Sequence, residues 1–212
     1  MKLERRILNI ENLQVRSVDD GPSLISGYAS VFNRDSVEMY GFVERIAPGA
    51  FTRTLKEAND VKALWNHDSN YPLGSTRAGT LKLEEDKTGL AFELDPPNNN
   101  WGNDVRESIR RGDTSGVSFG FYIRKQEWDD TDPDNVIRTI LDVDLIEISP
   151  TPFPAYPDTS VEAREVRAAY ESYKATRQAA GAADEIEGTS QEIQAELEAI
   201  ATELELAEAE NE

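Results

Sequence analysis

The sequence predicts a mainly β fold of the α+β class, with a β-barrel or β-sandwich at its centre and a few helices at its periphery. Up to about residue 158, short segments rich in β-branched and aromatic residues alternate with turn-forming residues, a pattern typical of antiparallel strands. Only two short segments have helical periodicity, and strands do not alternate with helices as they do in parallel βαβ units. A chain of 212 residues is long enough for one domain with a sizeable core and a tail.

The expected strands are bounded by turn signals. The segments 79–84 and 89–94 are separated only by the loop 85–88 and are expected to form a hairpin. The two longest are joined by an acidic turn at 129–134, and the prolines from Pro150 onward stop the second. The predicted strands are residues 23–32, 42–46, 61–66, 79–84, 89–94, 116–127 and 136–149.

Two segments predict helices, because each has a pair of apolar residues four positions apart on one face. The segments are 48–59, with Phe51 and Leu55, and 101–111, with Val105 and Ile109. Gly112 follows the second segment directly, as expected at a helix C-terminus.

Composition excludes several classes of protein. A net charge of −19 would repel DNA and anionic lipid, so we expect neither nucleic acid nor a membrane as a partner. No stretch approaches the roughly 20 apolar residues of a membrane helix, and the first seven residues lack the apolar core of a secretory signal. Without cysteine there is no disulfide, thiolate metal site or cysteine nucleophile. We therefore expect a cytoplasmic protein.

The last quarter of the chain differs from the rest. From Thr159 the composition shifts to Ala, Glu and Gln, and residues 159–212 carry a net charge of −10, against −9 for residues 1–158. Apolar residues from Ile186 to Leu204 follow a short heptad-like spacing. Two interpretations remain open: a helix that pairs with a partner, or a solvated, largely disordered acidic run.

His67 is a candidate general base. It is the single histidine of the chain and follows the apolar run that ends at Trp65, where a strand leaves the core and its side chains can line a cleft. A structural or solvated histidine is the alternative. A metal site is disfavoured, because one histidine and no cysteine leave only carboxylates as further ligands, and we expect no cofactor.

Ser118 is a candidate nucleophile, in the segment Ser115-Gly116-Val117-Ser118-Phe119-Gly120-Phe121. The Gly-x-Ser-x-Gly pattern does not indicate an α/β-hydrolase elbow, because the residues after Ser118 continue as a strand and not as a helix. The flanking glycines would let a substrate backbone approach Ser118 closely. The alternatives are a serine in a half-buried strand whose glycines allow a bulge, and Ser115 as nucleophile.

Glu147 is a candidate partner of the histidine. Strand alternation places it on one face with Leu141, Val143 and Leu145. A carboxylate at the end of an apolar face must be paired, and it could orient a histidine as a triad acid does. A salt bridge to a nearby arginine (Arg106, Arg110 or Arg111) is the alternative. Asp144 is the second candidate for the triad acid.

Taken together, these segments resemble the phage prohead protease family, which is related in fold to the herpesvirus assembly proteases. The resemblance covers roughly residues 5–163. Its landmarks, in order, are Gly27-Tyr28-Ala29-Ser30-Val31-Phe32-Asn33, Glu44-Arg45-Ile46-Ala47-Pro48-Gly49-Ala50-Phe51, Leu64-Trp65-Asn66-His67-Asp68, Ser115-Gly116-Val117-Ser118-Phe119-Gly120-Phe121 and Leu145-Ile146-Glu147-Ile148-Ser149.

The resemblance implies a small closed β-barrel ringed by helices. We expect a protease domain at 1–163, and the acidic tail at 164–212 lies outside the resemblance. His67 matches the family's catalytic histidine and Ser118 its nucleophile. The second histidine of the herpesvirus triad has no counterpart, so its role would pass to a carboxylate, either Glu147 or Asp144, or be absent.

The activity implied is that of a serine endopeptidase of capsid maturation. Its substrates would be the scaffolding protein, or the scaffolding segment of the major capsid protein, and often the protease itself, cleaved inside the immature capsid in the host cytoplasm. The tail would recruit the enzyme or support self-association. The alternative is a non-catalytic scaffold or adaptor of capsid assembly, which the presence of both His67 and Ser118 disfavours.

Overall fold

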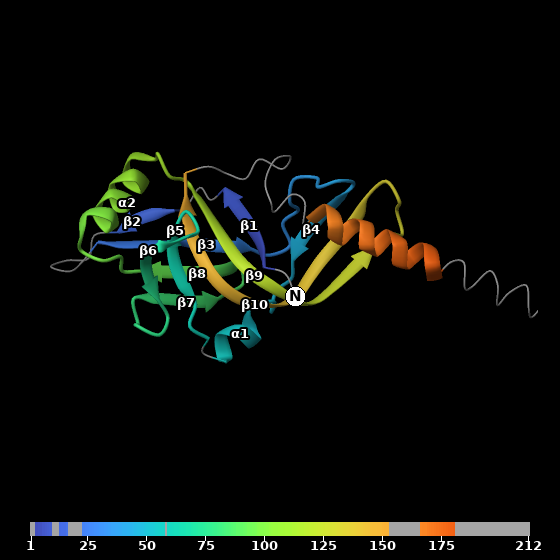
Figure 1. Ribbon diagram of the computed structural model, residues 1–212, viewed down its shortest axis with the longest axis horizontal. Helices are drawn as coiled ribbons and strands as arrows, with labels where there is room; N and C mark the ends of the chain where they lie inside the picture. The colour runs from blue at the N-terminus through green and yellow to red at the C-terminus, as the bar shows by residue number, and fades with distance from the viewer. Residues whose placement is uncertain (1–2, 10–12, 17–22, 58, 153–165, 181–212) are drawn as a thin grey trace, which may run out of the picture. The chain divides into compact units, whose positions relative to one another are not determined.

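The chain divides into two compact units, the first ending at Glu165 and the second beginning at Val166. The computed structural model describes residues 3–9, 13–16, 23–57, 59–152 and 166–180 (Figure 1). In the second unit, residues 166–180 form a helix. The acidic segment with the apolar stripe from Ile186 to Leu204 lies outside the described residues.

The first unit is mainly β. Its strands are β1 (Glu4–Asn9), β2 (Gln14–Arg16), β3 (Leu24–Val31), β4 (Phe42–Ile46), β5 (Lys62–Trp65), β6 (Asp68–Ser75), β7 (Leu81–Glu85), β8 (Gly89–Leu94), β9 (Gly116–Asp129) and β10 (Val136–Thr151). Its helices are α1 (Thr52–Lys56) and α2 (Asn100–Arg111).

The larger sheet is organised around β9 and β10, the two long strands that run side by side in Figure 1. Its order is β1-β9-β10-β5-β6, and β4 also pairs with β10. β9 lies antiparallel along one edge of β10. On the other edge, β4 pairs in parallel with residues 136–140 and β5 with residues 147–148. The end of β10, which carries Glu147, therefore lies between β9, which carries Ser118, and β5, which precedes His67.

The smaller sheet has the order β2-β3-β8-β7, and its neighbours are all antiparallel. Both sheets contribute to one hydrophobic core, in which alternate residues of several strands face the same cluster. The cluster includes Leu90, Phe92 and Leu94 of β8 and Val117, Phe119 and Phe121 of β9. α2 adds Val105 and Ile109, the pair expected on its buried face.

The expectation of a mainly β fold with some helices is confirmed. The closed barrel implied by the resemblance is not found. In the described residues, pairing runs from β1 to β6 in one sheet and from β2 to β7 in the other, and no pairing joins the two. Barrels and sandwiches share one alternating pattern, because both bury one face of each strand. Whether edge strands meet depends on twist and bulges, which the pattern does not specify.

Four elements differ from the expected ones. β1, β2 and β6 were not predicted: β1 begins with three charged residues, β2 has only three residues, and β6 contains Pro72, a residue largely confined to edge strands. The helix expected over residues 48–59 is limited to α1. Gly49 has a φ of 92°, outside the helical region, so a helix can begin only after it.

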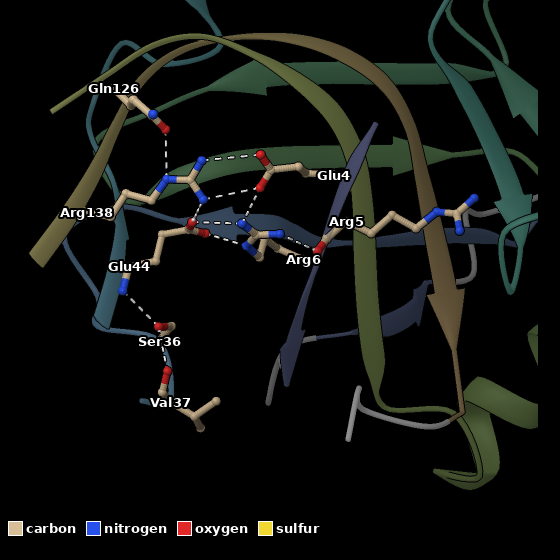
Figure 2. Close-up of polar contacts among 8 residues, drawn as sticks. All are labelled: Glu4, Arg5, Arg6, Ser36, Val37, Glu44, Gln126 and Arg138. Carbon is tan, nitrogen blue, oxygen red and sulfur yellow. Dashed lines mark hydrogen bonds and ion pairs between the residues drawn. The ribbon is translucent and has the colours of Figure 1, made fainter. Parts of the chain in front are cut away.

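A buried ion cluster fastens the N-terminal strand to the rest of the larger sheet (Figure 2). Arg6 of β1 binds both carboxylate oxygens of Glu44 in β4, and Arg138 of β10 donates to Glu44 Oε2 at 3.0 Å. Glu4 closes the ring, at 2.6 Å from Arg6 and 3.3 Å from Arg138. Arg138 is 1% and Glu44 4% exposed. Such buried charges are tolerated because each has an opposite partner.

Candidate active site

The strand β9 presents two different faces. Val117, Phe119 and Phe121 point into the hydrophobic core. Ser118 and Gly120 alternate with them and therefore lie on the opposite face of the sheet. Ser118 pairs with Ile7 of β1 on one side and with Ser149 of β10 on the other. The candidate nucleophile is thus flanked by two strands in the middle of the sheet.

A β-bulge in β10 brings Glu147 to the same face as Ser118. The register shifts between Leu145, opposite Phe121, and Glu147, opposite Gly120, so Ile146 is the extra residue. Strict alternation would have left Glu147 on the side of Leu145, which is the core side, so that prediction was wrong. The bulge reverses the alternation, as bulges near functional sites often do.

His67 lies in a tight turn between β5 and β6. Asn66 and His67 have φ values of 50° and 63°, in the left-handed region that Asn and His tolerate better than most residues. Two bonds of Asn66 help to tie the turn to the end of β10: the Asn66 N–H donates to Pro150 O at 3.1 Å, and the Thr151 hydroxyl donates to Asn66 Oδ1 at 2.9 Å. The turn therefore aims the His67 ring along β10.

The imidazole of His67 contacts the carboxylate of Glu147, with 2.6 Å between Nδ1 and Oε1. An ionised carboxylate can only accept a hydrogen bond, so when Glu147 is ionised and the ring is neutral, this contact requires the proton on Nδ1 and leaves Nε2 as the basic nitrogen. The other carboxylate oxygen accepts the hydroxyl proton of Ser149 at 2.6 Å. Both oxygens of Glu147, a residue only 4% exposed, thus have partners.

Gly120 provides the space for this carboxylate. A Cβ at that position would lie 2.6 Å from Glu147 Oε1, closer than a carbon and an oxygen can approach. Arg5 of β1 pairs with Gly120 on the far side, and its Nε lies 3.7 Å from Glu147 Oε1. The missing side chain lets groups on β1 and β10 meet across β9. The residue was expected to admit a substrate backbone, but the Glu147 carboxylate occupies that space.

The hydroxyl of Ser118 has no hydrogen-bond partner within the described residues, and the side chain is 0% exposed. It lies directly opposite Ser149, whose hydroxyl contacts both Glu147 and the His67 backbone. Side chains opposite one another in an antiparallel pair share a face and lie about 5 Å apart at Cβ. Ser115, the alternative nucleophile, is exposed and precedes β9.

The structure separates the two candidate acids. Asp144 contacts two arginines, with Arg53 Nη2 at 2.6 Å and Arg124 Nε at 2.5 Å. The hydrogen bond from Arg124 lowers the pKa of Asp144 most. Burial opposes this, and the hydrogen bond from Arg53 lowers the pKa further. Its carboxylate is thus held in an ion pair, while that of Glu147 contacts His67.

The arginines expected near Glu147 lie elsewhere. Arg106 donates to the carbonyls of Ser23, Pro96 and Pro97, while Arg110 and Arg111 pair with Glu107 and Asp113. The cation beside Glu147 is instead Arg5, which the sequence analysis missed together with Ser149. Ser149 could have been found, because a residue two positions after Glu147 in a strand shares its face.

Other kinds of site have no support in the described part of the chain. There, no three histidine or acidic side chains converge as metal ligands would. Within the same residues, every helix is too short or too polar to span a bilayer.

A serine and a buried carboxylate on neighbouring strands, with a histidine on an adjacent turn, are the kinds of residue that a serine hydrolase uses. Residues 11–175 match the family described as caudovirus prohead serine protease. The chain therefore belongs to the caudovirus prohead serine proteases, which makes it a serine protease of phage capsid maturation.

Two individual proteins are similar to this chain. The prohead protease of Enterobacteria phage HK97 is 26% identical over 162 residues, which span 74% of this chain and 68% of that protein. The bacteriophage T4 capsid assembly protease, gp21, is 12% identical, with a TM-score of 0.44 over 70% of this chain and 98% of that one.

Proposed function

We propose that this chain is the endopeptidase that cleaves the scaffolding protein, or the scaffolding segment of the major capsid protein, inside the immature capsid in the host cytoplasm, and that it also cleaves itself. Ser118 is the nucleophile, His67 the general base and Glu147 the acid that orients it. The observation that supports these roles best is the 2.6 Å contact between His67 Nδ1 and Glu147 Oε1, beside the strand that carries Ser118.

The chemistry follows from the proton positions. With its Nδ1 proton directed at Glu147, His67 can accept the hydroxyl proton of Ser118 at Nε2 as the oxygen attacks the scissile carbonyl. Glu147 stabilises the imidazolium that forms. The ring then protonates the leaving amine, and water releases the acyl group from Ser118 by the reverse sequence. Peptide hydrolysis of this kind needs no cofactor.

Substrate access requires movement around Ser118. Its side chain has no exposed surface, so a scissile carbonyl can reach the hydroxyl only when the groups covering it separate. Within the described residues, the Ser118 hydroxyl has no hydrogen-bond partner. This is consistent with a catalytic group, because catalytic hydrogen bonds often tighten only when the substrate is bound.

In the proposed function, residues 1–163 carry out catalysis and the acidic tail, 164–212, recruits the enzyme to the assembling capsid. The tail carries no serine or histidine of the matched motifs, and its net negative charge would favour a partner with a basic or apolar helical face. Truncation after Ala180 should leave peptide hydrolysis intact and reduce packaging of the protease into assembling shells. Loss of hydrolysis by the purified, folded, truncated enzyme would contradict this division.

The deciding experiment incubates the purified protein with the capsid and scaffolding proteins of the same phage and maps the new termini. We expect cleavage by the unaltered protein and by Ser115→Ala, and none by Ser118→Ala. Cleavage by Ser118→Ala with loss in Ser115→Ala would move the nucleophile to Ser115. Cleavage of other proteins in preference to these two would contradict the proposed substrates.

A further inference from the structure

Ser149 bridges the two residues proposed as base and acid. Its hydroxyl donates to Glu147 Oε2 at 2.6 Å and accepts the backbone N–H of His67 at 3.2 Å. The side chain is 0% exposed, and the residue lies directly opposite Ser118 in the β9–β10 pair.

We propose that Ser149 is a positioning residue of the active site, which fixes the His67 turn and the Glu147 carboxylate relative to one another. The proposal rests on the catalytic roles of Ser118, His67 and Glu147. It assigns to Ser149 no contact with the substrate and no part in the covalent step.

The first function of Ser149 is to hold the backbone of the turn. His67 has a φ of 63°, and a non-glycine residue keeps a left-handed conformation only when its surroundings stabilise it. The bond from His67 N to Ser149 Oγ supplies part of that stabilisation, next to the bonds that Asn66 makes to Pro150 and Thr151. Without the hydroxyl, this N–H would lose its acceptor.

The second function is to select the orientation of the carboxylate. Because Ser149 occupies Oε2, Oε1 is left to meet His67 Nδ1. Arg5 lies 3.7 Å from the same Oε1 and is the competing partner. A carboxylate no longer held by Ser149 could turn toward the guanidinium, which would weaken its contact with the imidazole.

The test measures Ser149→Ala by the rate of Ser118 labelling with a fluorophosphonate, from about pH 5 to about pH 9, where a histidine base titrates. The substitution should lower the maximal rate by about 10- to 100-fold, the size expected for loss of a hydrogen bond to a charged group. The acid limb should also move to lower pH. A Glu147 carboxylate that has turned toward Arg5 stabilises the imidazolium of His67 less. Ser149→Thr, which keeps the hydroxyl, should restore both the rate and the pH profile.

A matched control separates positioning from general stability. Thr54 is also 0% exposed, and its hydroxyl also accepts a backbone N–H, that of Leu145 in β10, at 3.2 Å. Thr54→Val should reduce the folded fraction without changing the labelling rate or the pH profile per folded molecule. Should Ser149→Ala fail to fold, Ser149→Cys keeps the volume with a weaker donor and should show the same shift of the acid limb.

Different outcomes would contradict the positioning role of Ser149 and the catalytic role of Ser118. A Ser149→Ala protein with unchanged rate and unchanged acid limb would overturn the positioning role and leave the Ser118 nucleophile intact. Labelling that persists in Ser118→Ala but is lost in Ser149→Ala would make Ser149 the nucleophile, and both proposals would fail.

Discussion

Two buried carboxylates of the larger sheet, Glu44 and Glu147, have opposite surroundings. Glu44 is bound through both oxygens by Arg6 and again by Arg138, within the ion cluster. Glu147 has a histidine and a serine at 2.6 Å and an arginine only at 3.7 Å. A buried carboxylate whose charge is balanced by arginines stabilises the fold. A carboxylate whose nearest basic partner is an imidazole can instead affect which ring nitrogen of that imidazole carries the proton.

The N-terminal strand connects the two centres. Arg5 and Arg6 are neighbours in β1 and therefore point to opposite faces. Figure 2 shows Arg6 directed into the ion cluster and Arg5 directed away from it. On its own face, Arg5 reaches Glu147. The ion cluster and the candidate active site thus lie on opposite faces of one sheet. Substitutions in the ion cluster should lower stability, and substitutions on the other face should lower catalysis.

The largest effect is expected for the proposed nucleophile and the proposed base. Ser118→Ala and His67→Ala should each lower turnover by about 10⁶-fold, and the double variant should be hardly worse than either, because members of a triad act as a unit. Turnover of the scaffolding protein by the folded variants is the measurement. Additive losses in the double variant would mean that the two residues act independently, and the proposed dyad would be wrong.

Glu147→Gln should have the next largest effect, a loss of turnover of about 10⁴-fold with the fold preserved, because an amide no longer fixes the required imidazole tautomer. Asp144→Asn is the control, since Asp144 contacts Arg53 and Arg124. Turnover should be followed on protein shown to be folded by circular dichroism. A larger loss of turnover in Asp144→Asn than in Glu147→Gln would transfer the role of the acid to Asp144.

The candidate residues of this site could be picked from the sequence, but the face of Glu147, the arginine beside it and the group that fills the space at Gly120 could not. The apolar run before His67 placed it at the end of a strand, and the need to pair a carboxylate within β10 singled out Glu147. Alternation alone turned Glu147 toward the core, because no residue pattern shows that Ile146 bulges. The bulge becomes visible only once Leu145 and Glu147 are paired with β9.

The fold shows the same limit. Strands with a clear apolar face, such as β3, β4 and β8, were predicted within a residue or two of their bounds. β1 was missed because Glu4, Arg5 and Arg6 read as a polar segment, whereas their partners lie on strands far along the chain. A pattern of apolar residues indicates which side chains are buried against a core. It does not indicate which charged residues pair when they lie far apart in the sequence.

On the stabilising side, Glu44→Gln should lower the free energy of unfolding by about 3–5 kcal/mol, the cost of breaking a buried ion pair by removing one partner. Turnover per folded molecule should stay near normal. Urea denaturation gives the first quantity and cleavage the second. Glu84→Gln, which removes an exposed carboxylate of β7, should change stability by less than about 0.5 kcal/mol. A loss of turnover in folded Glu44→Gln would show that the two centres are coupled through β1.

The smallest effect is expected for Glu4 and depends on pH. Burial raises the pKa of Glu4, but attraction by Arg6 and Arg138 outweighs it, so the folded-state pKa lies below the ordinary value of about 4.5. A lowered carboxyl pKa contributes stability above the unfolded value, and this contribution is lost as the pH falls through the folded value. The difference in unfolding free energy between the unaltered protein and Glu4→Gln should therefore be constant near neutral pH and shrink below about pH 4.5, where Glu4 becomes neutral like glutamine. Urea titrations of both proteins at a series of pH values measure this difference. A difference that stays constant down to about pH 3 would mean that Glu4 adds no charge-dependent stability, and that Glu44 alone fastens β1 to the sheet.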